Sequence, residues 1–308
     1  MDKGERTDAK IYTCATVTKG MAGKELTDMD ALVSGGAVGF TDDGIPIMDA
    51  GLLERAMTKA ASLNVPVSLH EEDPALITDN GINRGKASEH YGIGGSPREA
   101  EISMIRRDLE IALRTGAALN IQHISTKEGV ELVRQAKRKA AAQGTGGIHA
   151  EATPHHFSLT QDAVIRHGAL AKMNPPLREE SDRQAIIEGL RDGTIDIIAT
   201  DHAPHSKEEK ERPITKAPSG IIGLETALAL GITNLVGERQ LSMAQLIAAM
   251  AANPAKMYGL PAGTLAEGAA ADIVIFDPDA SQTVRDFASK SSNTPFAGQT
   301  LRGVVKYT

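Results

Sequence analysis

The sequence predicts an α/β fold, an incomplete TIM-like (β/α)8 barrel of about six βα units followed by remnant strands of a β-sandwich. Predicted strands and helices alternate along the first 260 residues without hairpin signals, as in a parallel sheet covered by helices. The strands are continuous apolar runs, which indicates that both faces of the sheet are buried. Only six such units are found, whereas a closed parallel barrel needs eight.

Short runs rich in apolar and β-branched residues mark the strands. We expect these strands at residues 10–17, 37–41, 65–69, 119–122, 148–153 and 195–200. Apolar residues at helical spacing mark the helices between them, and several of these runs end at a glycine. The helices are expected at residues 26–33, 52–63, 97–115, 127–142 and 182–190, then around 224–235 and 243–251.

The chain changes character near residue 260. Residues 263–268 have the composition of a turn, residues 271–278 that of an exposed strand, and residues 304–307 that of a last strand. This is too little chain for an independent domain. We therefore expect a barrel domain over residues 1–260 that lacks its first two βα units, and a partial small β domain over residues 261–308.

Composition narrows the class of protein. The chain has 33 basic and 40 acidic side chains, a net charge of −7, which argues against nonspecific nucleic-acid binding. No apolar run approaches the roughly 18 residues that span a bilayer. The single cysteine, Cys14, cannot form an internal disulfide and fits a reducing compartment. These features predict a cytoplasmic enzyme without a nucleic-acid or membrane partner.

Polar side chains follow four of the predicted strands. They are Asp43, His70, His123 and Asp201. The carboxyl ends of parallel barrel strands share one face, where catalytic groups gather. A single histidine at a strand end is more often an ordinary hydrogen-bonded residue, but four strands ending this way favour a site for a divalent metal such as zinc.

Residues 201–205, Asp-His-Ala-Pro-His, form the sharpest motif. Asp201 is suited to bind a metal and to take a proton from metal-bound water. His205, beyond a proline turn, either faces a substrate or caps a loop. Asn174, in a loop stiffened by two prolines, either recognises a cyclic amide or carboxylate or caps the turn. The loop 217–223 precedes a helix, so its backbone N–H groups are weak candidates for holding an anion.

Two charged runs have plainer interpretations. Residues 71–73, Glu-Glu-Asp, are expected to be a solvated helix start, where acids complement the helix dipole. Residues 207–212 are expected to be a mobile, exposed loop near the mouth of the site.

Five blocks occur in order along the chain: FTDDG at 40–44, QHIS at 122–125, TPHH at 153–156, KMNPPLR at 172–178 and ATDHAPH at 199–205. Together with residues 220–225 and SNTPF at 292–296, they resemble bacterial class I dihydroorotases of the amidohydrolase superfamily. The resemblance covers essentially the whole chain. Related cyclic amidohydrolases share the metal frame, whereas the MNPPLR and DHAPH blocks together are more specific to dihydroorotase.

The resemblance implies a two-zinc hydrolase on a distorted barrel of the metal-dependent hydrolase type. Such an enzyme interconverts (S)-dihydroorotate and N-carbamoyl-L-aspartate in pyrimidine biosynthesis. By position, His70 and His123 would bind one zinc, Asp43 would bridge both, and Asp201 would bind the other. Asp201 would also act as general base and then protonate the leaving nitrogen. The substrate ring and carboxylate would be held by Asn174, His205 and the backbone of Ser219 and Gly220.

The sequence departs from the family pattern near its beginning. The family has a His-x-His and a neighbouring arginine after its first strand, and an asparagine after its second. Here the only histidines before His123 are His70 and His90. We therefore expect a chain truncated at its N-terminus, without the His-x-His ligands of one zinc and with impaired activity.

Two other functions stay open. A different cyclic amidohydrolase, such as a hydantoinase or allantoinase, would be expected to carry a carbamylated lysine as metal bridge, and Asp43 argues against it. An inactive scaffold subunit for aspartate transcarbamoylase fits the missing His-x-His, but the retained site residues argue against that too. A small-molecule substrate is the expected partner, with a homodimer or a transcarbamoylase as candidate protein partners.

Overall fold

The computed structural model describes residues 9–145 and 147–308. Six parallel strands form one sheet in the order β1-β2-β3-β4-β5-β6, so each strand pairs with its neighbours along the chain. They are β1 (Cys14–Ala15), β2 (Gly39–Phe40), β3 (Val67–Leu69), β4 (Leu119–Ile121), β5 (Ile148–Ala152) and β6 (Ile197–Ile198). No pairing joins β1 to β6 within the described residues. The predicted incomplete barrel is therefore confirmed.

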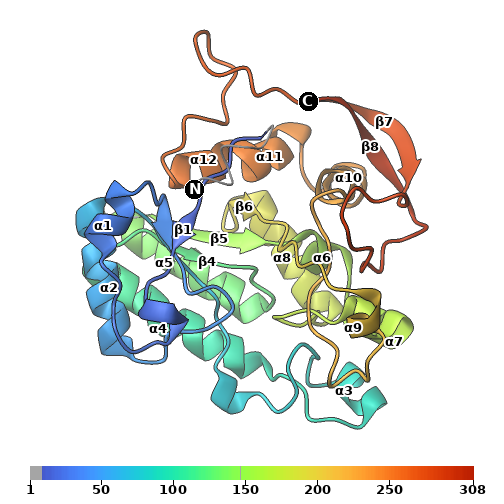
Figure 1. Cartoon of the computed structure of the whole chain (residues 1–308), viewed down its shortest axis with the longest axis horizontal. Helices are drawn as coiled ribbons and strands as arrows, with labels where there is room; N and C mark the ends of the chain where they lie inside the picture. The colour runs from blue at the N-terminus through green and yellow to red at the C-terminus, as the bar shows by residue number, and fades with distance from the viewer. Residues whose placement is uncertain (1–8, 146) are drawn as a thin grey trace.

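Helices surround this central sheet (Figure 1). The major ones are α1 (Met29–Ser34), α2 (Ala50–Leu63), α4 (Arg98–Thr115), α5 (Lys127–Gln143) and α8 (Glu180–Asp192). Helix α2 packs on α4, α4 on α5, and α5 on α8, so the outer layer follows the order of the strands. This is the arrangement that repeated βα units produce.

Shorter helical segments fill the connections. Between the strands they are η2 (Lys19–Met21), η3 (Pro74–Leu76), α3 (Lys86–Tyr91), α6 (Pro154–Ser158), α7 (Asp162–His167) and η4 (Gly168–Ala171). After β6 come α9 (Lys207–Lys210), α10 (Ala227–Gly231), η5 (Ile232–Val236), α11 (Met243–Ile247), η6 (Ala248–Ala252) and α12 (Asn253–Met257). The two helices expected after the sheet are thus present, each continued by a π-helical segment.

Local chemistry explains where the long helices begin and end. The side chains of Asp49 and Thr126 accept hydrogen bonds from free N–H groups in the first turns of α2 and α5. Gly116 and Gly144 stop α4 and α5 in the left-handed conformation, which costs glycine little. Because these signals are local, the sequence locates these helices to within about two residues.

The core is one continuous apolar cluster that includes the strands and the inner faces of the helices. Phe40, Val67, Leu119 and Ile121 on the strands are fully buried. The sheet interior also contains polar residues, however, among them Asn120 and Glu151. Asn120 Nδ2 donates to Glu151 Oε1 at 2.6 Å. The core below the strand ends is therefore partly a hydrogen-bonded network.

The C-terminal region forms a separate two-stranded antiparallel sheet of β7 (Ile275–Thr283) and β8 (Thr300–Tyr307). Both strands expected from the sequence exist, but β7 begins at Ile275 instead of residue 271 and ends later than predicted, and β8 begins at Thr300 instead of residue 304. Strand β8 lies against α10 and η5, with Leu301 buried. Gly303 has a φ of 96°, which residues with a Cβ rarely adopt, and a Cβ there would lie 2.5 Å from Ile232 Cδ1, so this position favours glycine. The domain division near residue 260 stays a prediction.

Two interpretations of charged runs are wrong in part. Glu71 and Glu72 are each only 2% exposed; Asp73 alone behaves as a helix start, accepting a hydrogen bond from Ala75 N. Burial, and then the nearby Asp108 carboxylate, raise the pKa of Glu71 well above its usual range, so this carboxyl group can be buried protonated. Residues 207–210 form helix α9 and Lys210 is buried, whereas Lys207, Glu208, Glu211 and Arg212 are exposed as expected.

None of the helices in the described residues is long and apolar enough to cross a membrane.

Candidate functional site

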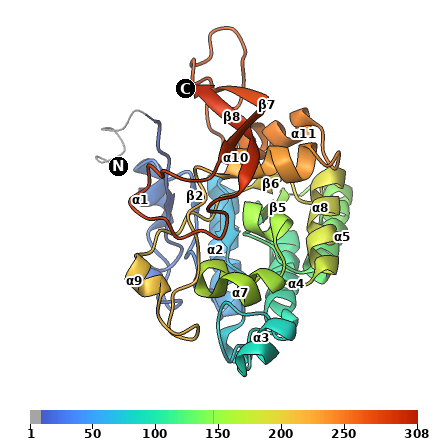
Figure 2. The same cartoon turned by 90° about the vertical axis from the view of Figure 1, so that its right-hand side faces the viewer.

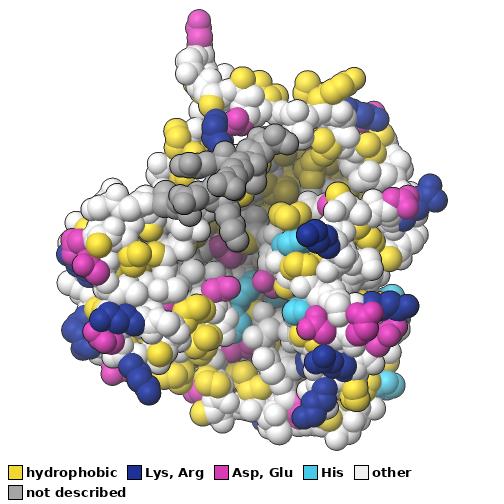
Figure 3. All heavy atoms as spheres, in the orientation of Figure 1, with side chains coloured by type: hydrophobic (Ala, Val, Ile, Leu, Met, Phe, Trp, Pro, Cys, Tyr) yellow, Lys and Arg dark blue, Asp and Glu magenta, His cyan; other side chains and the backbone are white. Residues whose placement is uncertain are grey.

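Histidine and acidic side chains gather in a hollow at the centre of one face of the molecule (Figure 3). Asp43, His70, His123 and Asp201 each follow a different strand of the sheet, β2, β3, β4 and β6 respectively. The two histidines are buried, Asp201 is partly buried and Asp43 is exposed. The sheet therefore positions the predicted ligands along its carboxyl edge.

Three of these four residues have an unusual backbone. The φ angles of Asp43, His123 and Asp201 are 26°, 32° and 49°, in a region that side chains with a Cβ rarely adopt. Such conformations cost on the order of 1–3 kcal/mol each and are concentrated at functional sites. The chain leaves each strand by turning sharply.

His70 and His123 form the best-defined part of the site. His70 Nδ1 lies 3.0 Å from His123 Nε2, and the rings meet edge to face with centroids 4.8 Å apart. Two nitrogens bound to one tetrahedral zinc at about 2.0–2.1 Å would be about 3.3 Å apart. The observed spacing is within a few tenths of an ångström of that value, so this donor pair fits a metal ion.

A buried carboxylate lies on the other side of the His70 ring. His70 Nε2 is 3.2 Å from Glu72 Oε2, and Ser96 Oγ donates to Glu72 Oε1 at 3.1 Å. This contact places a carboxylate against the His70 ring nitrogen that does not face His123. Glu72, which the sequence suggested was solvated, is therefore buried against a candidate ligand.

The electrostatics of the site match these roles. Burial, followed by the neighbouring His70 and His156, lowers the pKa of His123 well below its usual range, so its ring is neutral at physiological pH. Burial, and next the negative charge of Asp43, raise the pKa of Asp201 to about 6, while His70 opposes the shift.

The structure brings these residues together only in part. Across residues 9–145 and 147–308, no three side chains of His, Cys, Asp or Glu converge in an arrangement that would by itself hold a metal ion. The histidine pair is in contact, whereas the two carboxylates repel each other. Asp43 is exposed, whereas the neighbouring Asp42 is buried and accepts a hydrogen bond from Thr18 N at 3.0 Å. The complete four-ligand set stays a prediction.

Asn174 lies beside the histidine pair, as a substrate-binding residue should. Its Nδ2 is 3.4 Å from His70 Nε2, and its Oδ1 is buried without a hydrogen-bond partner among the described residues. An unpaired buried acceptor is costly unless a ligand completes it. The loop that carries Asn174 is held by His156, whose Nε2 donates to Pro175 O at 3.0 Å.

His205, Ser219 and Gly220 come together at one wall of the site. His205 Nε2 donates to Ser219 O at 2.9 Å. The N–H of Gly220 donates to Lys172 O at 2.9 Å, so this group is not free to bind an anion as the loop sequence suggested. The N–H of Ser219 has no acceptor within the described part of the chain, and remains the available donor.

Sequence reasoning missed the residues that support this wall. Lys172 Nζ donates to Ile214 O and Ala217 O, and Lys210 Nζ donates to Pro218 O and Gly220 O, at 2.8–2.9 Å. Asn293 joins the wall from the C-terminal region. The lysines occur in the KMNPPLR block and in a charged run, and neither pattern indicates that their ammonium groups are buried against carbonyls.

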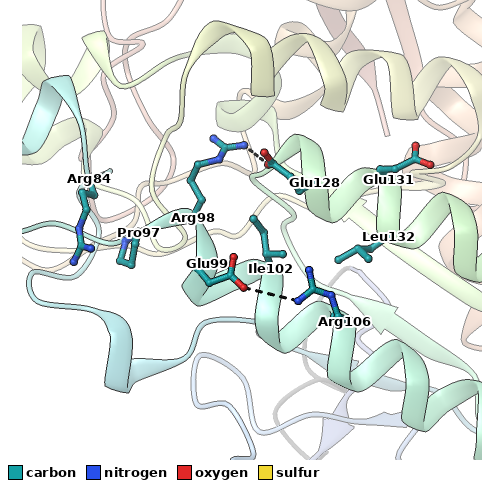
Figure 4. Close-up of a pocket in the computed structure, with 9 residues that line it drawn as sticks. All are labelled: Arg84, Pro97, Arg98, Glu99, Ile102, Arg106, Glu128, Glu131 and Leu132. Carbon is teal, nitrogen blue, oxygen red and sulfur yellow. Dashed lines mark hydrogen bonds and ion pairs between the residues drawn. The ribbon is translucent and has the colours of Figure 1, made fainter.

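A separate cavity of about 630 Å³ lies between the first turns of α4 and α5, away from these residues (Figure 4). Three arginines and three glutamates are among its lining residues, so their formal charges cancel. Arg98 is committed to Asp182 and Glu128, and Arg106 is 3.8 Å from Glu99. Because Arg98 is already paired with two carboxylates, it is not available to bind an anionic ligand in this cavity.

The sequence is similar to that of known enzymes. A sequence profile described as the amidohydrolase family matches residues 5–308. The chain is 55% identical over 307 residues to a dihydroorotase of Clostridioides difficile (strain 630), covering 100% of this chain and 72% of that protein. It is 49% identical over 309 residues to a dihydroorotase of Lactococcus lactis subsp. lactis (strain IL1403), with the same two coverages.

Among solved structures, the chain is similar to an L-hydantoinase (dihydropyrimidinase) from Arthrobacter aurescens. The TM-score is 0.80 at 26% sequence identity, and the match covers 98% of this chain and 69% of that one. The similarity extends across the sheet, the surrounding helices and most of the C-terminal region.

Proposed function

The chain belongs to the amidohydrolase family, and we propose that it is a dihydroorotase, which hydrolyses the cyclic amide of (S)-dihydroorotate reversibly to N-carbamoyl-L-aspartate. The reaction is a step of pyrimidine biosynthesis. The observation that carries the proposal is full-chain identity of 49–55% to dihydroorotases, combined with the His70–His123 pair beside the unpaired Asn174 acceptor. Hydantoinases share the fold at about half that identity.

Amidohydrolases are generally metal-dependent, and zinc is the metal we propose here. His70 Nδ1 and His123 Nε2 would hold it together with Asp201 and Asp43, because neutral imidazoles and carboxylates are the ligands zinc prefers. A bound zinc ion supplies Lewis-acid polarisation and lowers the pKa of a coordinated water toward 7. The spacing of the histidine nitrogens supports this assignment.

Asp201 is the residue proposed to move the proton. With a pKa of about 6 it is largely ionised at neutral pH and still basic enough to accept a proton from the attacking water. The water oxygen forms a bond to the ring carbonyl carbon, the carbon–nitrogen bond breaks, and Asp201 returns the proton to the leaving ring nitrogen. The carboxylate is thereby regenerated, and the same path runs in reverse for ring closure.

The substrate is proposed to lie between Asn174 and the wall formed by His205, Ser219 and Gly220. Asn174 Oδ1 is suited to accept a hydrogen bond from a ring N–H, since it has no protein donor within the described residues. The N–H of Ser219 is suited to donate to the substrate carboxylate. His205 fixes Ser219 through its carbonyl, and so positions that donor.

The test is binding and turnover by the full chain loaded with zinc. Dihydroorotate is compared with hydantoin and allantoin, with binding measured by calorimetry and N-carbamoyl-aspartate measured by chromatography. We expect dihydroorotate to bind most tightly and to be the substrate hydrolysed, with hydrolysis abolished in Asp201→Asn. Tighter binding of hydantoin, or its preferential hydrolysis, would contradict the assignment.

Location and protein partners follow from this function as proposals. Pyrimidine synthesis and the single unpaired Cys14 favour the cytoplasm. A homodimer or an aspartate transcarbamoylase complex is tested by size-exclusion chromatography with light scattering, alone and with the transcarbamoylase added. A chain that binds the transcarbamoylase but not dihydroorotate would instead be a scaffold subunit.

A further inference from the structure

Asn293 is a buried amide from the C-terminal region that contacts two separate segments of the candidate site. It is only 3% exposed. Its Oδ1 accepts a hydrogen bond from His205 N at 3.1 Å, and its Nδ2 donates to Ala203 O at 3.0 Å and Gly220 O at 3.2 Å. Its main-chain oxygen also accepts from Ile222 N at 3.1 Å. One side chain thus links the segment 203–205 to the loop 219–222.

We propose that Asn293 is a positioning residue for substrate binding, which fixes His205 relative to the Ser219–Gly220 loop. The inference rests on the proposed function, because it takes these two segments as the wall that holds the substrate carboxylate. Asn293 itself acts through the two segments and has no role in the chemical step.

Only an amide side chain of this length satisfies the three groups it meets. Two of them are carbonyl oxygens, which need N–H donors, and the third is an N–H, which needs an acceptor. An aspartate would keep the acceptor but would bring a negative oxygen against both carbonyls. The two segments are also very close, since a Cβ at Gly220 would lie 2.5 Å from Ala203 Cβ.

Two lysines also bind the loop that contains Ser219 and Gly220, and they bear on what the loss of the Asn293 side chain should do. Lys172 and Lys210 together hold the carbonyls of Ile214, Ala217, Pro218 and Gly220, and Gly220 O alone is shared with Asn293. Loss of the Asn293 amide should therefore leave the loop attached while the segment 203–205 shifts relative to it. The expected defect is in substrate binding more than in folding.

Asn293 lies between β7 and β8, in a segment that loops back over the barrel (Figure 2). Phe296, three residues further on, is 1% exposed and anchors this segment in the core. The C-terminal region therefore contributes to the candidate site and does not only pack behind α10.

The experiment compares Asn293→Asp and Asn293→Ala with a matched control, Asn253→Ala, in the full zinc-loaded chain. Asn253 Nδ2 donates to Asp196 O at 2.7 Å, at the opposite end of β6 from Asp201, so its loss removes a similar bond away from the site. Steady-state kinetics with dihydroorotate give KM and kcat, and thermal unfolding gives stability. Hydrogen exchange with mass spectrometry follows peptides that cover residues 200–224.

We expect Asn293→Asp to raise KM at least tenfold while kcat changes less than threefold, because interactions shared by ground and transition states affect KM alone. Asn293→Ala should also raise KM, by a smaller factor. It provides the test if Asn293→Asp does not fold. Exchange of residues 200–224 should accelerate in both, but not in Asn253→Ala. Equal KM changes in the Asn293 and Asn253 variants would overturn the proposal.

Failure of the proposed function is distinguishable from failure of this inference. If the wild-type chain neither binds nor hydrolyses dihydroorotate, the proposed function fails, and hydrogen exchange alone then tests whether Asn293 fixes the segment 203–205 relative to the loop 219–222. Faster exchange in residues 200–224 of the Asn293 variants supports it, and unchanged exchange overturns it.

Discussion

Asp201 should destabilise the metal-free protein at neutral pH, so its replacement by asparagine should increase stability. Burial and the charge of Asp43 raise the pKa of Asp201 from 3.8 to about 6, which means that the fold opposes ionisation of this carboxyl group. Between these two values the folded chain binds a proton that the unfolded chain has lost. The free energy of unfolding therefore falls as the pH rises from about 4 to about 6.

The size of the effect follows from the shift. About two pKa units correspond to about 3 kcal/mol at 1.36 kcal/mol per unit. Screening by solvent at the partly exposed rim reduces this to on the order of 2 kcal/mol. Asp201→Asn removes the penalty with almost no change in shape. The variant should thus match the wild type near pH 4 and exceed its unfolding free energy by about 2 kcal/mol at pH 7.5.

Urea unfolding of the metal-free chain at both pH values measures this difference. The matched control is Asp192→Asn, at the end of α8. Although burial opposes ionisation of Asp192, hydrogen bonds from Thr194 and Arg134 hold its pKa below its ordinary value. Its replacement should therefore destabilise the chain at pH 7.5. If Asp201→Asn is destabilising or neutral at pH 7.5, the carboxylate is not opposed by its surroundings and the argument fails.

Three further predictions follow from the site and its supports. His123→Ala should weaken zinc binding at least tenfold in calorimetry, whereas His167→Ala on the exposed end of α7 should leave it unchanged; equal effects would refute the ligand assignment. Arg178→Met should lower the unfolding free energy by about 3 kcal/mol, because it leaves the buried acceptors Asn83 Oδ1 and Ser96 O without the Arg178 Nη1 donor, while Arg166→Met at the surface should cost under about 0.5 kcal/mol; similar losses in urea unfolding would contradict this prediction. The full chain should bind zinc weakly and hydrolyse dihydroorotate slowly, because its sheet is open and one candidate ligand is exposed; two tightly bound zinc ions with full activity would contradict this.

The strand-end residues could be predicted from the sequence because the signal is local. Each predicted ligand follows an apolar run, and the carboxyl ends of parallel strands share one edge whatever the rest of the chain does. The same reasoning overestimates strand length: β1 and β6 each contain two residues, although eight and six were expected. Apolar runs report burial, whereas a strand ladder also needs paired backbone groups; β2, which pairs with both β1 and β3, is likewise only two residues long although five were expected.

The supporting residues were not predicted because their roles depend on distant contacts. Glu72 and Lys210 are charged, and in isolation a charged residue indicates a solvated surface. Glu72 is buried through Ser96 and His70, and Lys210 through the carbonyls of Pro218 and Gly220. A charged side chain can be buried only where the fold supplies polar partners for it. Its burial therefore depends on contacts with residues distant in the sequence.

Asp43 is the most exposed of the four candidate ligands. Asp43 follows β2, the strand next to the β1 edge, and no further strand pairs with β1 in the described residues. Because Asp43 is exposed, water screens its charge, whereas His70 and His123 are buried. Attraction between a cation and a screened carboxylate is several-fold weaker than at a buried one. Of the four candidate ligands, Asp43 should thus contribute least to metal affinity, and the buried histidine pair should dominate it.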